Sequence, residues 1–299
     1  MEKRFAIVHL NIKSSKGVLL SVARSSLLFS LGTLLSRLSG LIREVVLAGV
    51  FGAGLLMDCF LVANRIPNML REMAAEGALG SSFTKVFSSL SVESSEKAKS
   101  LWVACFWFFS LILLVLCTVG VLAAPWLVDV LTLYSDKTRG PEFIQQTVGL
   151  TRILFPFIGI MTLSSLVAGV LHERGKFFVS ALSPVSLNLG YILGALGLSY
   201  LLQGWGPDWI ESYIADKKIT GLALGVLLGG LCQLLWQMAA IWRTHIRGVL
   251  LWPKSFPWSQ DLKKVMVLMG PMLIASSATQ INVFVNTNFA TSLEVGAVS

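Results

Sequence analysis

The sequence predicts an all-α membrane protein that crosses the bilayer about seven times. Hydrophobic residues make up 55% of the chain and charged residues 13%, whereas a soluble protein carries roughly 25% charged residues. The mean hydropathy is +0.74, and apolar runs near the ~20 residues that span a bilayer recur along the whole length. Barrel strands would instead read as short alternating segments, so a polytopic helical protein is the predicted class.

The apolar runs predict seven spans, interrupted by charged or turn-forming segments. The second is too long for one straight helix, and Pro67, Gly77 and Gly80 offer places where it can bend. The predicted spans are 24–48, 57–90, 101–123, 148–171, 177–202, 219–242 and 265–290.

Basic residues predict that the N-terminus is cytoplasmic, because Lys and Arg concentrate in cytoplasmic loops. With that orientation, the outer loops hold Lys137, Arg139, Lys217 and Lys218. The inner segments hold a larger set, namely Lys3, Arg4, Lys13, Lys16, Arg24, Lys97, Lys99, Arg174, Lys176, Arg243, Arg247, Lys254, Lys263 and Lys264.

These features predict four segments. Residues 1–23 are a basic cytoplasmic tail, and 24–243 are a six-helix lobe. Residues 244–264, with Pro253, Pro257 and two tryptophans, form a cytoplasmic amphipathic linker. Residues 265–299 begin a second lobe. The chain ends directly after this span, so we expect a truncated protein.

The first two spans carry charges that a lipid-facing helix would not tolerate. A charge at mid-bilayer costs roughly 2.5–3.5 kcal/mol on insertion scales, so such residues usually face protein or a watery cavity. The set is Arg37, Arg43, Glu44, Asp58, Arg65, Arg71, Glu72, Glu76 and Lys85. We interpret these residues as the lining of a transporter cavity for an anionic lipid.

At about 100° per residue, the polar residues of the first span fall within an arc of about 120°. Gly40 lies in the middle and leaves a notch where a headgroup or a second backbone can approach. The stripe comprises Ser36, Arg37, Gly40, Arg43 and Glu44. The alternative is that the arginines snorkel to the interface and pair with neighbouring acids.

In the second span, one face of a continuous helix would carry Asp58, Arg65, Asn68, Glu72 and Glu76. Arg71 lies about 120° from Arg65, and a kink at Pro67 would change its direction. Mutual pairing could satisfy most of these charges, so a polar bundle core competes with an anion site. Arginine suits a diphosphate because its guanidinium stays charged and forms forked hydrogen bonds.

Other signals are weaker. Asn282, Asn286, Thr287 and Asn288 make one side of the seventh span polar, and hydrogen bonding between helices is favoured over an ion or substrate contact. The four cysteines lie in apolar runs without metal-ligand spacing. We find no catalytic motif. We therefore expect neither an enzyme nor a metal site, and the dispersed basic residues do not indicate nucleic-acid binding.

SRLSGLIREVVLAGVFGAG (36–54) and DCFLVANRIPNMLREMAAEGALGSSF (58–83) resemble the N-terminal signature of the MurJ/MviN family. The stretches 155–188 and 269–293 are also similar to it. These proteins are lipid II flippases of bacterial peptidoglycan synthesis, within the multidrug/oligosaccharidyl-lipid/polysaccharide (MOP) exporter superfamily. The resemblance implies two six-helix lobes around a cavity that opens alternately to each side of the cytoplasmic (inner) membrane.

The resemblance also implies residue roles. Arg37, Arg43 and Arg71, beside Ser36, match cavity arginines that would hold the pyrophosphate. Asp58 and Glu76 match acidic positions of the second helix, the latter a gate residue. Glu44, Arg65 and Glu72 are expected to pair charges or gate. Glu72 stands where a second basic residue is common, which lowers the local positive potential.

The implied substrate is lipid II, with membrane lipids and the cell-wall synthesis and division machinery as further partners. No cofactor is expected, although coupling to a sodium ion or to the membrane potential is left open. Two competing functions remain at this point. One is a cation-coupled multidrug exporter of the same superfamily, which would favour acidic cavity residues. The other is a non-transporting envelope scaffold whose charges pair with one another.

Overall fold

A computed structural model describes residues 2–132, 136–204, 216–242 and 258–291. Within these ranges, the side chains of 2–22, 24–25, 74–77, 136–139 and 203–204 lie outside the description, and the first of these sets covers most of the predicted tail. Most of the predicted linker, 244–257, also lies outside the described residues. The lobe boundaries therefore stay predictions.

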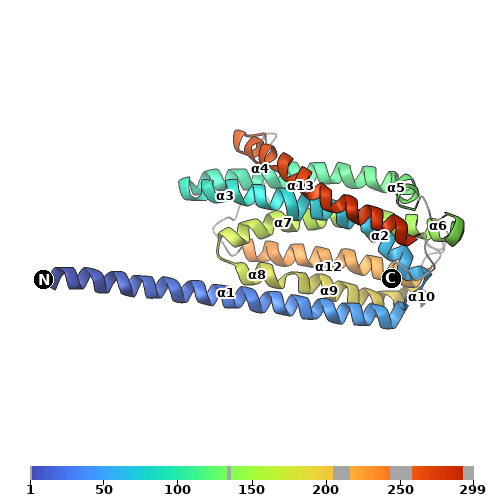
Figure 1. Cartoon of the computed structure of the whole chain (residues 1–299), viewed down its shortest axis with the longest axis horizontal. Helices are drawn as coiled ribbons and strands as arrows, with labels where there is room; N and C mark the ends of the chain where they lie inside the picture. The colour runs from blue at the N-terminus through green and yellow to red at the C-terminus, as the bar shows by residue number, and fades with distance from the viewer. Residues whose placement is uncertain (1, 133–135, 205–215, 243–257, 292–299) are drawn as a thin grey trace.

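The first helix, α1, runs from Glu2 to Phe51 without interruption. At ~1.5 Å per residue, its 50 residues extend about 75 Å, more than twice the ~30 Å hydrocarbon core of a bilayer. Figure 1 shows that its N-terminal part extends beyond the other helices, while its C-terminal part lies along the bundle. Gly52, with a φ of 62°, turns the chain into the next helix.

The second pass is one continuous rod of three segments, α2 (Leu55–Arg71), η1 (Glu72–Leu79) and α3 (Gly80–Glu93). The predicted irregularity is present, and it takes the form of the π-helical segment η1. The chain remains helical through Pro67. π-Helical turns occur often at functional sites, and this one begins directly after Arg71.

Five further helical stretches of the described residues are long and apolar enough to cross a membrane. Together with α1 and the α2–η1–α3 rod, they give the seven predicted passes, and the all-α membrane class is confirmed. The five consist of α4 (Ser95–Leu122), α6 with α7 (Asp136–Leu154 and Phe157–Glu173), α8 to α10 (Phe177–Leu182, Pro184–Leu193, η2 at Gly194–Leu198, and Ser199–Gly204), α12 (Lys217–Trp242) and α13 (Gln260–Thr291). The short helix α5 (Ala124–Leu131) follows α4.

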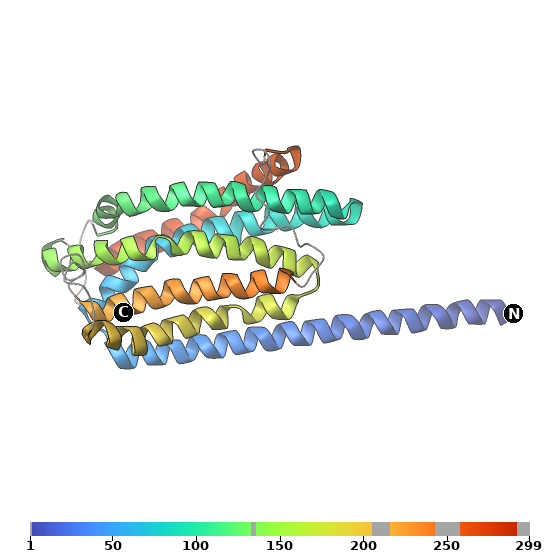
Figure 2. The ribbon, with the colours of Figure 1, turned by 180° about the vertical axis from the view of Figure 1, so that it is seen from behind.

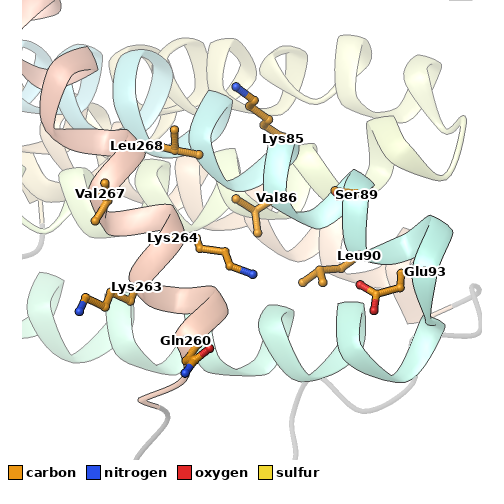
Figure 3. A pocket seen from close by; sticks show the side chains of 10 residues that line it. All are labelled: Lys85, Val86, Ser89, Leu90, Glu93, Gln260, Lys263, Lys264, Val267 and Leu268. Atoms are coloured by element: carbon orange, nitrogen blue, oxygen red, sulfur yellow. The ribbon is translucent and has the colours of Figure 1, made fainter.

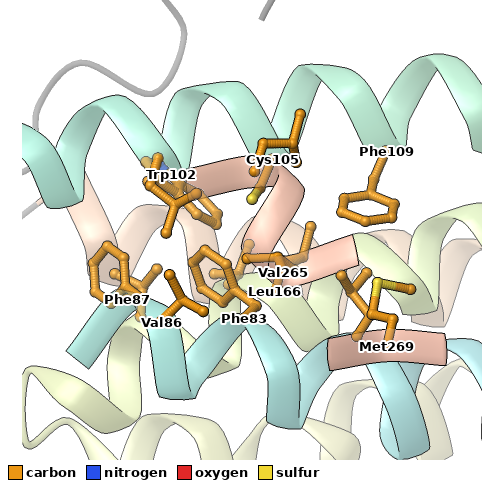
Figure 4. Packing of buried hydrophobic residues seen from close by; sticks show 14 of the residues in the cluster. Phe83, Val86, Phe87, Trp102, Cys105, Phe109, Leu166, Val265 and Met269 are labelled. Atoms are coloured by element: carbon orange, nitrogen blue, oxygen red, sulfur yellow. The ribbon is translucent and has the colours of Figure 1, made fainter. Parts of the chain in front are cut away.

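Two apolar cores hold the passes together. One joins α3, α4, α7 and α13 around Trp102 and the stacked rings of Phe83 and Phe87, whose centroids lie 5.1 Å apart (Figure 4). The other joins α2, α6, α7, α9 and α12 around Phe60, Phe143 and Phe157. Helix α13 belongs to the first core and packs against η1, α3 and α4.

Glycines allow α9 and α12 to pack closely against each other. A Cβ on Gly225 of α12 would lie 2.4 Å from the carbonyl oxygen of Gly190 on α9, and a Cβ on Gly190 would lie 2.4 Å from the Cα of Gly229. No side chain fits at these distances, so the two backbones touch, as small residues allow between membrane helices. This contact fixes α9 within the bundle, and α1 packs on the far side of α8 and α9 (Figure 2).

Candidate functional site

The polar stripe of α1 meets the side chain of Asn188 on α9. Its amide nitrogen donates to the carbonyl oxygen of Ser36 at 3.2 Å and to the hydroxyl of Ser39 at 2.8 Å. Its amide oxygen accepts from Nη1 of Arg43 at 3.1 Å. Gly40 lies beneath this amide, and a Cβ there would come within 3.7 Å of the amide nitrogen. The notch predicted at Gly40 is therefore filled by Asn188.

Arg43 has two further neighbours. Its Nη2 pairs with the carboxylate of Glu44, and its guanidinium carbon lies 4.8 Å from the centre of the Tyr191 ring. The Arg43 side chain is 26% exposed and that of Glu44 is 59% exposed, so the pair opens toward the outside of the described bundle. A guanidinium over an aromatic face is stabilised electrostatically. Arg43 is thus held in place yet remains accessible.

Tyr191 connects the first helix to the second. Its ring packs edge-on against Phe60 of α2, with centroids 6.2 Å apart, and its hydroxyl accepts from the amide of Asn64 at 3.5 Å. One side chain of α9 thus contacts Arg43 of α1 and also Phe60 and Asn64 of α2.

Arg71 is the last residue of α2, and its side chain points back along that helix. Its Nε donates to the side-chain oxygen of Asn68 at 3.1 Å, and its Nη2 lies 3.5 Å from Oε1 of Glu72. The side chain is 17% exposed. The direction that periodicity left open is thus set by Asn68.

Arg65 and Glu72 lie on the same face of the rod, and that face is turned to α13. Nε of Arg65 donates to the Thr287 hydroxyl at 2.9 Å, and Oε2 of Glu72 accepts from the Gln280 amide at 2.9 Å. The expected hydrogen bonding between helices is confirmed for Thr287. The exposed Asn286 instead donates within its own helix, to Asn282 at 3.4 Å.

The remaining predicted residues are spread more widely. Ser36 is half-buried and contributes its carbonyl, whereas Arg37 is exposed on the next position of α1. Asp58 is fully buried in the first turn of α2, where the helix dipole favours a negative charge. The side chain of Glu76 lies outside the described residues, so its predicted gating role stays a prediction.

Sequence reasoning did not assign Asn188, Tyr191, Asn64 or Gln280 to the site. Asn188 and Tyr191 are three residues apart on α9, which places them on one helix face. A polar and an aromatic residue at that spacing, four and seven residues after Pro184, was the available signal. No comparable sequence signal marks Gln280, because an isolated glutamine in an apolar helix usually satisfies a local hydrogen bond.

Two hollows lie along α3, away from the arginines. A groove of about 700 Å³ separates α3 from α13, with Lys264 and Glu93 directed into it and Lys85 and Lys263 directed away (Figure 3). Its mixture of charges gives it no single sign. A second hollow of about 520 Å³ lies between α3 and α7 and is lined mainly by small and hydroxyl residues, with His172 and Lys85 at its edge.

Comparison with known proteins connects this arrangement to one family. The sequence profile of the family described as "Lipid II flippase MurJ" matches residues 47–299. The chain is 33% identical over 284 residues to "Lipid II flippase MurJ" of Burkholderia cenocepacia, covering 94% of this chain and 52% of that protein. It is 34% identical over 268 residues to "Probable lipid II flippase MurJ" of Rhizobium meliloti, covering 89% and 47%.

A third relative, "Probable lipid II flippase MurJ" of Vibrio cholerae, is 32% identical over 286 residues, covering 92% of this chain and 51% of that protein. The chain therefore spans about half the length of the curated relatives it matches. The family match extends from the end of α1 to the last residue and includes six of the seven passes in full. This chain is a multi-pass membrane protein that belongs to the MurJ lipid II flippase family.

Proposed function

We propose that this chain takes part in moving lipid II from the cytoplasmic to the outer leaflet of the bacterial cytoplasmic membrane. Arg37, Arg43 and Arg71 bind the diphosphate that links the sugar to the lipid. The single observation that carries this proposal is the position of Arg43, which Asn188 and the Tyr191 ring hold in place while its side chain stays 26% exposed.

The chemistry of these side chains supports a diphosphate over other ligands. A guanidinium binds phosphate oxygens through forked, charge-assisted hydrogen bonds. The Arg43 side chain is 26% exposed, so part of its guanidinium can reach a ligand. Arg37 lies exposed on the same helix, 6 positions before Arg43. The exposed Arg37 and the partly exposed Arg43 can therefore donate charge-assisted hydrogen bonds to a doubly charged headgroup.

The proposed direction of transport depends on a cytoplasmic N-terminus. The turns between α3 and α4 and between α7 and α8 lie at the end of the bundle from which α1 projects (Figure 1). Arg174 and Lys176 lie in the turn between α7 and α8 and Lys97 lies in the first turn of α4, whereas Lys217 and Lys218 begin α12 at the other end. This distribution supports an N-terminal side that faces the cytoplasm.

Binding of lipid II to the purified chain tests the proposal. Native mass spectrometry in detergent compares the wild type with Arg43→Ala and with Arg174→Ala, which changes an arginine in the turn after α7. We expect Arg43→Ala to weaken lipid II binding about tenfold or more, as for a lost charged hydrogen bond, and Arg174→Ala to leave it unchanged. Equal binding by all three proteins would overturn the proposal.

A further inference from the structure

The groove between α3 and α13 lies where both helices reach the end of their passes. The two helices contact each other where the hydroxyls of Ser81 and Ser82 meet the sulfur of Met272, at 2.9 and 3.4 Å. Beyond this contact the groove, of about 700 Å³, extends to the end of α3 at Glu93 and the start of α13 at Gln260 (Figure 3). The ends of membrane-crossing helices lie near the level of the lipid headgroups, so the mouth of the groove lies at that level.

Two opposite charges face each other across this mouth. Lys264 of α13 and Glu93 of α3 point into the groove from opposite walls (Figure 3). In the part of the chain that the structure describes, no ion pair joins them. Lys264 contacts Asp261 at 2.8 Å instead, and Glu93 contacts Lys97.

These local contacts leave both charges able to bind a further group. The side chain of Lys264 is 63% exposed and that of Glu93 is 58% exposed, and exposed ion pairs of this kind are weak. An ammonium group has three N–H donors and a carboxylate has two acceptor oxygens. Lys264 can therefore donate to an anion in the groove, and Glu93 can accept from a cation, while each keeps its present contact.

The walls of the groove become apolar toward the interior of the bilayer. Val86 lies about two turns before the end of α3, and Leu268 lies about one turn after Lys264 on α13. Val267, on the same wall as Leu268, is 65% exposed. The groove therefore offers charged groups at the headgroup level and apolar side chains deeper in the membrane, which is the order of the parts of a phospholipid.

We propose that this groove binds phosphatidylethanolamine. The lipid phosphate contacts Lys264, the primary ammonium donates to Glu93, and an acyl chain lies along Val86 and Leu268. The ethanolamine headgroup carries one negative and one positive group on a short link, which matches the two opposite charges of the walls. The bound lipid fills the space between α3 and α13. This site is separate from the arginines and does not depend on the proposed transport activity.

The same chemistry disfavours the other common headgroups. Phosphatidylglycerol has no cation for Glu93 and brings its phosphate close to that carboxylate, and like charges repel. Phosphatidylcholine carries a quaternary ammonium, which has no N–H to donate to a carboxylate. A preference for a primary amine is therefore the property that identifies this site.

Native mass spectrometry of the purified chain in detergent tests the proposal. The protein is titrated with phosphatidylethanolamine, phosphatidylglycerol and phosphatidylcholine of identical acyl chains, and the affinity for the first bound lipid is compared. We expect the wild type to bind phosphatidylethanolamine about five- to tenfold more tightly than either of the others, as for one charge-assisted contact. A wild type that binds phosphatidylglycerol equally well or better would overturn the proposal.

Three variants locate the preference in the groove. Glu93→Gln is expected to reduce the preference for phosphatidylethanolamine over phosphatidylglycerol to less than about twofold, and Lys264→Gln to weaken phosphatidylethanolamine binding about five- to tenfold. Lys263→Gln is the matched control, because Lys263 is directed away from the groove (Figure 3), and its affinities should equal those of the wild type.

The ratio of two lipid affinities is measured within one protein, so a smaller folded fraction of the Glu93→Gln variant does not change it. A Glu93→Gln protein that keeps the wild-type preference contradicts the assignment of the ammonium to Glu93. If Lys263→Gln weakens binding as much as Lys264→Gln does, general surface charge explains the binding, and the proposed site is wrong.

Discussion

The Asn188 side chain of α9 holds Arg43 of α1 while binding the α1 backbone. Its oxygen accepts from Arg43 at 3.1 Å, and its nitrogen donates to the carbonyl of Ser36 and the hydroxyl of Ser39. One amide thus joins the helix that carries two of the candidate arginines to the helix pair fixed by the contact of Gly190 with Gly225. Arg43 is positioned by the bundle core rather than by α1 alone.

Asn188→Leu is expected to loosen α1, because it removes three hydrogen bonds between the helices. Such bonds average about 0.6 kcal/mol in membrane bundles, so the expected loss in free energy of unfolding is about 2 kcal/mol. Unfolding by SDS in mixed micelles measures it. Asn286→Leu is the matched control, since Asn286 is exposed and bonds only within α13 at 3.4 Å. Equal stability of the two variants would show that Asn188 does not hold α1.

Two substitutions of Tyr191 separate the contribution of its ring to diphosphate binding from that of its hydroxyl. Tyr191→Phe keeps the aromatic face beneath Arg43 and loses the long 3.5 Å contact to Asn64, so we expect the affinity for geranylgeranyl diphosphate to change less than about twofold. Tyr191→Leu removes the cation–π contact and is expected to weaken binding about threefold to tenfold. If Phe and Leu have the same effect, the ring does not orient Arg43.

Gly225 and Gly197 give a matched pair of helical glycines. A Cβ on Gly225 would collide with the Gly190 carbonyl at 2.4 Å, whereas a Cβ on Gly197 meets nothing within 4 Å. We expect Gly225→Ala to lower the free energy of unfolding by at least about 2 kcal/mol, as overpacking does. Gly197→Ala is expected to be neutral or slightly stabilising. A thermal unfolding scan in detergent compares the stability of both variants with that of the wild type. A Gly225→Ala protein as stable as the wild type would contradict the close packing of α9 on α12.

The fold was predictable because hydrophobic span length is a property of each local segment. The seven passes and the irregular second pass follow from apolar runs and from the glycine and proline residues between them. The site was predictable only in part. Arg43 and Arg71 stand out because a charge in an apolar run is energetically costly. Asn188, Tyr191 and Gln280 carry no such signal within their own helices. Their roles arise from the packing of distant passes, which periodicity within one helix does not contain.

Periodicity within one helix also gave only part of the directions of Arg65, Glu72 and Arg71 in the second pass. Periodicity placed Arg65 and Glu72 together and left Arg71 undetermined, because the phase after Pro67 was uncertain. The structure keeps the first two on one side, where they meet α13, and Asn68 draws Arg71 back along α2. A helical wheel gives the shared direction of these residues but not which neighbouring helix they meet.

Orientation can be tested by labelling single cysteines in intact cells with a membrane-impermeant maleimide. The native thiols are first replaced, and Cys232 matters most because it is exposed whereas Cys59 and Cys105 are buried. Lys97→Cys, in the exposed first turns of α4, is expected to react only after the cells are permeabilised, because basic turns face the cytoplasm. Pro125→Cys, exposed at the start of α5, is expected to react without permeabilisation. The reverse pattern would invert the proposed direction of transport.

The central claim is that arginines from two passes serve one diphosphate. The most direct measurement compares the affinities for geranylgeranyl diphosphate and geranylgeranyl monophosphate, in the wild type and in the Arg43→Ala/Arg71→Ala double variant. The wild type is predicted to prefer the diphosphate about tenfold, and the double variant to bind both lipids alike. A double variant that still prefers the diphosphate by the wild-type factor would contradict the account.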